Sequence, residues 1–149
     1  MMKRFLLIVL ALCLAAAGAQ AKQTIVKSGK PTARIVANID NGVDKQAAEL
    51  LQDFVKRISG ATVQIVDGKA KRGDGVIGEG STDGLTGDGF RLQSRGDVLY
   101  ISSGGDKGAI YGVVTLLENY LGVAYYAAGA VDVPQMSTIT LPEIADHHE

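Results

Sequence analysis

Two segments with the period of an amphipathic helix, separated by short extended runs, constrain the fold of this sequence most. Apolar residues recur at helical spacing over residues 43–59 and again over residues 106–121. We expect Asn41 to cap the first helix and Gly60 to end it, and we expect Asp106 to cap the second. Each helix has one apolar stripe, which must be buried against another layer of the fold.

The runs between and around these helices have the composition of β-strands. They are residues 24–26, 34–39, 62–66, 76–78, 90–94, 98–102, 123–126 and 137–141. We therefore predict an α/β fold of the two-layer α+β type, with a mixed, largely antiparallel sheet and two main helices packed on one face. Gly112 lies inside the second helix at a cost of up to about 1 kcal/mol relative to alanine. Its presence predicts close packing of that turn on the sheet.

The first 21 residues have the organisation of an export signal. Lys3 and Arg4 form a basic start, residues 5–17 are apolar, and residues 19–21 (AQA) have the small-x-small pattern of a cleavage site. We expect cleavage after Ala21 and an exported product, periplasmic or extracellular. The alternative is an uncleaved N-terminal membrane anchor, which the short apolar run disfavours.

Charge and cysteine content exclude several classes of protein. The formal net charge is −1 and no basic run matches a nucleic-acid-binding surface, so we expect no nucleic-acid partner. No other apolar stretch reaches the ~20 residues that span a bilayer, so we expect no membrane attachment after signal removal. The one cysteine, Cys13, lies in the signal. The mature domain is therefore expected to have no disulfide and no thiolate chemistry.

Two glycine-rich stretches have the letters or the position of phosphate-binding loops. Residues 73–78 (GDGVIG) match the dinucleotide fingerprint, but they precede a strand instead of joining a strand to a helix. Residues 103–108 (SGGDKG) do lead into a helix, where free backbone N–H groups can hold an anion. That stretch lacks the closing Gly-Lys-Ser/Thr of a P-loop, so we interpret it mainly as a structural strand-to-helix turn.

Residues that carry catalysis are scarce. The two histidines, His147 and His148, are adjacent near the end of the sequence and are expected to lie in a frayed tail, away from any serine of the folded body. The aspartates of the glycine-rich region do not have the spacing of a calcium loop and are typical of turns. They are Asp74, Asp83 and Asp88. We therefore predict no catalytic residue, no cofactor and no metal site.

A series of short motifs follows the predicted elements in order. They are residues 58–60 (ISG), 63–66 (VQIV), 87–92 (GDGFRL), 99–102 (LYIS), 107–113 (KGAIYGV) and 117–122 (LENYLG). This pattern, over residues 34–141, resembles the N-terminal α/β domain of bacterial alpha-glucuronidases and is similar to the second-domain module of beta-N-acetylhexosaminidases. One departure is Lys107, where many relatives have arginine.

The resemblance implies a domain organisation and a partner. In those enzymes the module precedes a (β/α)₈ barrel, and the catalytic carboxylates belong to the barrel, so no catalytic residue carries over. We divide the sequence into a signal peptide (1–21), an N-terminal segment (22–33), the glycosidase-type α/β domain (34–141) and a C-terminal tail (142–149). Either the sequence is a truncated or split part of a glycosidase, or the module acts alone.

Two functions are therefore expected as alternatives. In the first, the chain is an exported accessory domain of a carbohydrate-active enzyme, and it docks a barrel in cis or in trans. In the second, it is a free-standing module that binds a glycan or a protein. The candidate interaction residues are Tyr125 and Tyr126, which alternate in direction so that one ring faces outward. Ordinary strand packing is the competing interpretation of both rings.

Overall fold

The computed structural model describes residues 23–149, and the predicted signal peptide lies outside the described residues. The elements are β1 (Gln23–Lys27), β2 (Lys30–Pro31), β3 (Ile35–Ala37), α1 (Gly42–Ser59), β4 (Ile65–Val66), β5 (Gly75–Ile77), β6 (Phe90–Arg95), β7 (Val98–Ser103), α2 (Gly108–Leu121), β8 (Ala124–Tyr125), the 3-10 turn η1 (Ala127–Gly129), β9 (Val131–Asp132), β10 (Ile139–Leu141) and β11 (His147–His148).

A six-stranded mixed sheet forms the centre of the described domain, in the order β11-β6-β7-β5-β3-β4. The pairs β3–β4, β3–β5 and β5–β7 are parallel, whereas β6–β7 and β11–β6 are antiparallel. Two smaller antiparallel sheets, β10-β1-β2 and β8-β9, complete the described part of the chain. The predicted α+β fold is thus confirmed, with parallel pairing from β7 to the edge strand β4 of the main sheet. Strand β3, between β5 and β4, is buried at every residue, as expected for a parallel strand covered on both faces.

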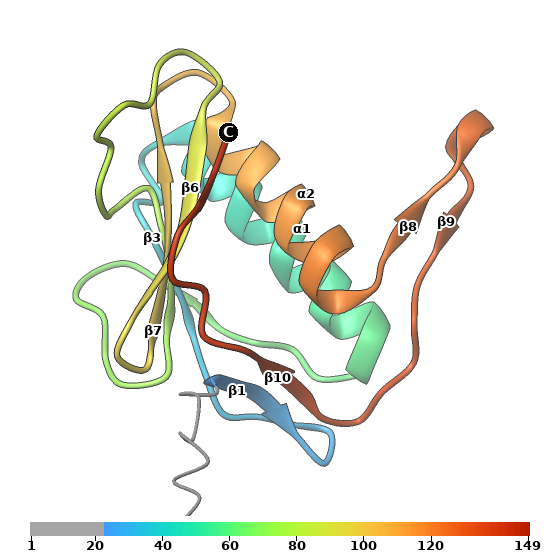
Figure 1. Ribbon diagram of the computed structural model, residues 1–149. Helices are drawn as coiled ribbons and strands as arrows, with labels where there is room; N and C mark the ends of the chain where they lie inside the picture. Colours follow the sequence, from blue (N-terminus) through green and yellow to red (C-terminus); the bar gives the residue numbers. More distant parts are fainter. Residues whose placement is uncertain (1–22) are drawn as a thin grey trace, which may run out of the picture.

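Both helices pack on one face of the sheet and against each other, as predicted (Figure 1). The core between the layers combines Leu92 and Ile101 of the sheet with Leu116 and Leu117 of α2. A Cβ atom added to Gly112 would lie 2.7 Å from Cγ2 of Ile101, which confirms the close packing predicted for that turn. Within residues 23–149, neither helix has the combination of length and apolar character that crossing a bilayer requires.

The helix ends agree with the sequence prediction at α1 and depart from it at α2. Asn41 caps α1 with its side-chain oxygen, 3.0 and 3.2 Å from two N–H groups of the first turn, and Gly60 ends the helix with a φ of 79°. The prediction that Asp106 caps α2 is wrong: Lys107 is the N-cap residue and makes no side-chain cap bond. The carboxylate of Asp88 accepts the Lys107 N–H instead, at 2.9 Å. The cap is therefore supplied by a distant loop.

The end of the sequence is a strand, so the prediction of a frayed histidine tail is wrong. In β11, His147 pairs with Leu92 and His148 pairs with Arg91 of β6. Upstream, Ile144 is buried and its carbonyl oxygen accepts the Ser94 N–H at 2.7 Å. The open edge of β6 binds this segment through main-chain hydrogen bonds, which need no apolar side-chain pattern.

Candidate functional site

The segment after α2 forms a hairpin that projects beyond the helices, on the side away from the sheet (Figure 1). We call residues 123–133 the arm; it contains β8, η1 and β9. Ala124 pairs with Asp132, and the Tyr126 N–H donates to the Ala130 carbonyl oxygen at 2.8 Å. Residues 123–131 (VAYYAAGAV) contain no charged side chain. A two-stranded ribbon alone is only marginally stable in water, so this arm depends on packing against other surfaces.

Tyr125 fixes the root of the arm to the helices. Its ring centroid lies 5.9 Å from that of Phe54 of α1, at an interplanar angle of 58°, a tilted aromatic pair. The Arg57 guanidinium lies 4.5 Å from the same Phe54 ring. Burial raises the pKa of Tyr125, and the nearby Glu118 carboxylate of α2 raises it further. Tyr125 therefore acts first as a packing residue between α1 and the arm.

Tyr126 is more exposed to solvent than Tyr125. Its side chain is 61% exposed, against 39% for Tyr125. It immediately precedes η1 at the tip of the arm. Of the two predicted interaction residues, Tyr126 is therefore the one whose ring faces solvent.

The outer face of α2 carries a second group of exposed or half-buried side chains, near the start of the helix. Tyr111 is 43% exposed, and Val114 and Thr115 beside it are half-buried. These three residues line a hollow of about 320 Å³ together with Phe90 and other residues. Sequence analysis missed Tyr111, although its position off the buried stripe of α2 is a readable signal. We call Tyr111, Val114, Thr115, Tyr125 and Tyr126 the α2–arm surface.

The outer face of α1 is of a different kind. It carries two exposed ion pairs at i,i+4 spacing, Lys45–Glu49 at 4.0 Å and Asp53–Arg57 at 3.8 Å. Exposed pairs of this type contribute little to stability but keep a helix face solvated. The apolar outer surface of the helical layer is therefore concentrated on α2 and the arm.

The turn over residues 103–108 is structural. A Cβ on Gly108 would collide with the Gly89 carbonyl oxygen, and a Cβ on Gly104 would approach the Thr86 nitrogen to 2.8 Å. Glycine is required there because another loop crosses at backbone distance. The adjoining hollow, about 350 Å³, is lined by two carboxylates, Asp44 and Asp106. Burial raises the pKa of Asp44. The protein's own acids thus occupy the helix starts, where an anion would otherwise bind.

The three aspartates of the glycine-rich region serve separate purposes. Asp74 pairs with Arg34 before β3, Asp83 accepts the Ser81 hydroxyl at 3.2 Å, and Asp88 caps α2. Within residues 23–149, no group of three or more His, Cys, Asp or Glu side chains is placed to hold a metal ion.

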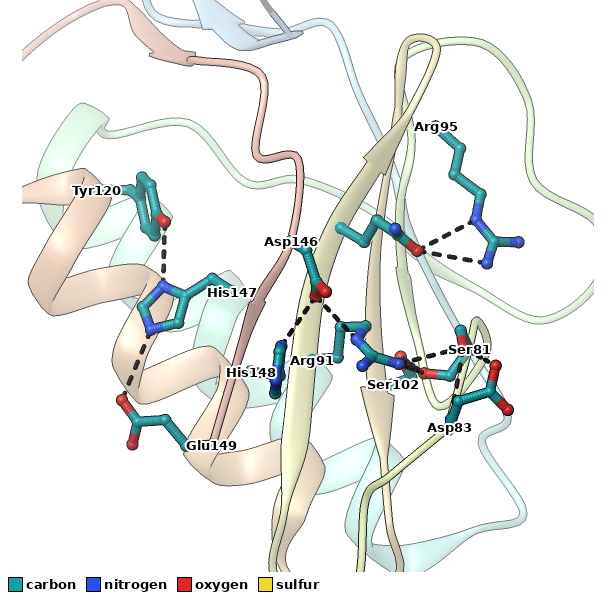
Figure 2. A network of polar contacts seen from close by, with 11 residues as sticks. Ser81, Asp83, Arg91, Arg95, Ser102, Tyr120, Asp146, His147, His148 and Glu149 are labelled. Carbon is teal, nitrogen blue, oxygen red and sulfur yellow. Dashed lines mark hydrogen bonds and ion pairs between the residues drawn. The ribbon is translucent and has the colours of Figure 1, made fainter.

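A polar network covers the face of β6 and β7 away from the helices, and Figure 2 shows it. Arg91 donates from Nε to Asp146 at 2.8 Å and from Nη1 to the Ser81 hydroxyl at 3.1 Å. Asp146 also contacts His148, 3.2 Å away. Burial alone would raise the pKa of Asp146, but the bonds from His148 and Arg91 hold it below its ordinary value. Asp146 and Arg91 lie between His148 and the Ser81 hydroxyl, so within this network no histidine is hydrogen-bonded to a serine.

The other histidine faces the helices. His147 Nδ1 lies 3.0 Å from the Tyr120 hydroxyl, and its Nε2 lies 3.5 Å from the Glu149 carboxylate (Figure 2). Its ring is also tilted against that of Phe90, at a centroid distance of 6.3 Å. No local sequence signal predicts these contacts, because they depend on β11 pairing with β6. They hold the end of the sequence against α2.

Comparison with known proteins gives a consistent family match. The family model described as glycosyl hydrolase family 20, domain 2, matches residues 18–146. No individual curated protein matches the sequence significantly.

Solved structures that resemble the chain are large glycosidases. A family GH115 4-O-methyl-alpha-glucuronidase, BtGH115A, with specificity for decorated arabinogalactans, is 14% identical with a TM-score of 0.54, over 83% of this chain and 18% of that one. A Streptomyces plicatus N-acetyl-beta-hexosaminidase is 16% identical with a TM-score of 0.47, over 83% of this chain and 23% of that one. A GH20 exo beta-N-acetylglucosaminidase from Vibrio harveyi is 16% identical with a TM-score of 0.47, over 82% and 16%. The first of these likenesses shows the fold, and the chain spans less than a quarter of each enzyme.

Proposed function

The chain belongs to the family of glycosyl hydrolase family 20, domain 2, and from this premise we propose that it is a non-catalytic accessory domain of a carbohydrate-active enzyme. The resemblance noted in the sequence is confirmed by this match. Because the chain corresponds to only 16–23% of the compared enzymes, their activities are not transferred to it.

The observation that carries the proposal is the α2–arm surface. The arm has no charged side chain from residue 123 to residue 131, and the first turns of α2 present Tyr111 and Thr115, while the neighbouring helix α1 presents ion pairs. Exposed apolar and aromatic side chains gathered on one layer of a domain support a docking role. The partner we propose is a (β/α)₈ catalytic barrel, in the same polypeptide or in a separate one, because the resembling enzymes carry their catalytic carboxylates on such a barrel.

Docking is tested with purified residues 22–149 and a barrel encoded in frame with this gene or beside it. We expect a saturable complex by titration calorimetry, and Tyr126→Ala should weaken it by about tenfold or more, because exposed aromatic anchors dominate interfaces. Gln46→Ala, at another exposed position, on α1, is the matched control and should leave affinity unchanged. Absence of binding, or equal effects of both substitutions, would contradict the proposal.

The same proposal predicts that the chain alone has no glycosidase turnover. Purified residues 22–149 should release no chromophore from aryl glucuronides or aryl N-acetylglucosaminides above the buffer rate. Turnover that survives repurification and is lost on substitution of one carboxylate would show that the domain is itself an enzyme.

Export is part of the proposal and is supported by the sequence of residues 1–21. Fractionation of the native host should recover the chain outside the cytoplasm, with Lys22 as its first residue. Recovery of an intact Met1 start from the cytoplasm would contradict it.

A second function is favoured by the exposure of the Tyr126 ring. In this alternative the chain is a free-standing module, and Tyr126 stacks on the apolar face of a sugar. A glycan array probed with the wild-type chain and with Tyr126→Ala separates the two functions. Glycan binding that is lost in the variant, without barrel binding, supports the module; barrel binding without glycan binding supports the accessory domain.

A further inference from the structure

A pocket lies at the amino ends of the parallel strands, away from the α2–arm surface. Arg34, Gln64 and Asp74 immediately precede β3, β4 and β5, and parallel pairing brings these three positions to one edge of the sheet. Together with Lys71, Arg72 and others they line a pocket of about 330 Å³. This volume is at the lower end of the range for small-molecule sites.

Asp74 organises the pocket. Its side chain is 3% exposed and accepts hydrogen bonds from Arg34 Nε at 3.2 Å, from Arg34 Nη2, and from the Lys71 backbone N–H at 2.7 Å. Burial alone would raise the pKa of Asp74, but these bonds hold it below its ordinary value. The Arg34 guanidinium is therefore locked in one orientation by an ionised partner.

The locked guanidinium still has donors for a ligand. Nη1 of Arg34 makes no hydrogen bond to any residue within 23–149, and the side chain is 27% exposed on the pocket side of the ion pair. A guanidinium presents several N–H donors in a planar fork that matches the geometry of carboxylates and phosphates. Preorganisation by Asp74 lowers the entropy that binding would otherwise cost.

Two further cations stand at the rim. The turn from Lys71 to Asp74 is closed by the Asp74 N–H donating to the Lys71 carbonyl oxygen at 3.1 Å. Arg72 is held from outside the pocket by Asp97, with Nε 2.6 Å from the carboxylate. With Asp97 counted, the site has three cationic side chains and two carboxylates. Each carboxylate pairs with an arginine, and Lys71 has no ion-pair partner within residues 23–149, which leaves one net positive charge. A concave site with an excess of one charge attracts ligands of the opposite charge.

We propose that this pocket binds an oxyanion, either the carboxylate of an acidic sugar or a phosphate group. Arg34 holds the anion, Lys71 closes over it, Arg72 adds positive charge at the rim, and the apolar side chains of Pro31 and Ala33 contact the rest of the ligand. This site is independent of barrel docking, because none of its residues belongs to the α2–arm surface. The two proposals can therefore fail separately.

The test is a titration of isotope-labelled residues 22–149, followed by amide NMR, with glucuronate, glucose and inorganic phosphate as separate probes. We expect saturable shifts at residues 71–75 with glucuronate or with phosphate, and none with glucose. The probe that saturates at the lower concentration identifies the source of the oxyanion. Raising the salt concentration should weaken binding, since part of the attraction is screened.

Variants decide whether the pocket is responsible. Lys71→Gln with Arg72→Gln removes both rim charges but keeps the backbone bond to Asp74, and we expect about tenfold weaker binding. Lys69→Gln, an exposed lysine of the same loop outside the lining, is the control and should bind like the wild type. An unchanged urea midpoint shows that the variants are folded. No saturable shift with either anion, an equal response to glucose, or an equal loss in Lys69→Gln would overturn the proposal.

Discussion

The two ends of the central sheet carry opposite charges and are built differently. At the end before β3 and β5, charged side chains form the site. Arg34 and its neighbours surround a buried carboxylate, Asp74, in a pocket with excess positive charge. At the end after β3 and β7, close backbone packing forms the site. Glycine loops cross at close distance there, and Asp44 and Asp106 line the hollow at the two helix starts.

The difference follows from how the sheet is covered. Helix N-termini attract anions, and the carboxyl ends of parallel strands in α/β proteins are the usual place for an anionic ligand. Here both helices lie on one face, so no crevice opens between helices on opposite faces (Figure 1). Asp88 already accepts the N–H at the start of α2. Affinity for an external anion is therefore found at the amino ends, where cationic side chains supply it.

The largest expected effect comes from removing the buried carboxylate. Asp74→Asn should lower the free energy of unfolding by about 2–4 kcal/mol, because it leaves Arg34 without its charge partner in a partly buried site. Urea denaturation monitored by circular dichroism measures it. The matched substitution at the other end, Asp106→Asn, should cost less than about 0.5 kcal/mol, since Asp106 is exposed and asparagine tolerates its φ of 35°. Equal losses of unfolding free energy in the two variants would contradict the proposed difference between the two ends of the sheet.

Glycine substitutions test the claim that backbone packing differs between the ends. Gly108→Ala forces a methyl group into the Gly89 carbonyl oxygen and should destabilise the fold by about 1–3 kcal/mol. Gly75→Ala meets nothing within 4 Å at an ordinary φ. It should be neutral or stabilise by up to about 1 kcal/mol through the unfolded state. Thermal unfolding of the two variants gives the comparison, and a larger loss in Gly75→Ala would reverse it.

The two ends should also respond oppositely to pH. The pKa of Asp74 is lowered in the folded state, so its contribution to stability is present above the unfolded pKa and is lost as pH falls through the folded value. The pKa of Asp44 is raised by burial, so stability decreases as pH rises from the unfolded value through the folded one. Unfolding free energies measured from pH 3 to 7 should show a shallower acid limb in Asp74→Asn. In Asp44→Asn the acid limb should be steeper. A shallower limb in Asp44→Asn would contradict the assignment.

The smallest effect concerns the two helix starts at the carboxyl end. Asn41→Ala removes the side-chain cap of α1 and should cost about 1 kcal/mol. Lys107→Ala removes no cap bond, because the bond at the start of α2 uses the Lys107 backbone, and should be close to neutral. Paired urea titrations resolve the difference. A comparable loss in Lys107→Ala would show that its side chain stabilises α2 in some other way.

The sequence predicted the features that depend on neighbours a few residues apart. The two helices, the Asn41 cap and the Gly60 end follow from periodicity, side-chain hydrogen bonding over two or three residues, and the freedom of glycine. The buried Gly112 was also readable, because a glycine inside an apolar helix needs a packing reason. For the candidate surface, the sequence identified Tyr125 and Tyr126, but their unequal exposure depends on Phe54, which is 71 residues away from Tyr125 in the chain.

The contacts at the two ends of the sheet and at the C-terminal strand depend on tertiary structure, because they join segments that are far apart in the sequence. Arg34 and Asp74 are 40 residues apart and meet since β3 and β5 pair in parallel. Asp88 replaces the expected cap Asp106 because the loop before β6 crosses the start of α2. The polar segment of His147 and His148 became a strand because an unpaired edge of β6 offers hydrogen bonds that no local pattern encodes. Periodicity fixes which faces must be buried, whereas strand order fixes which charges meet at the ends of the sheet.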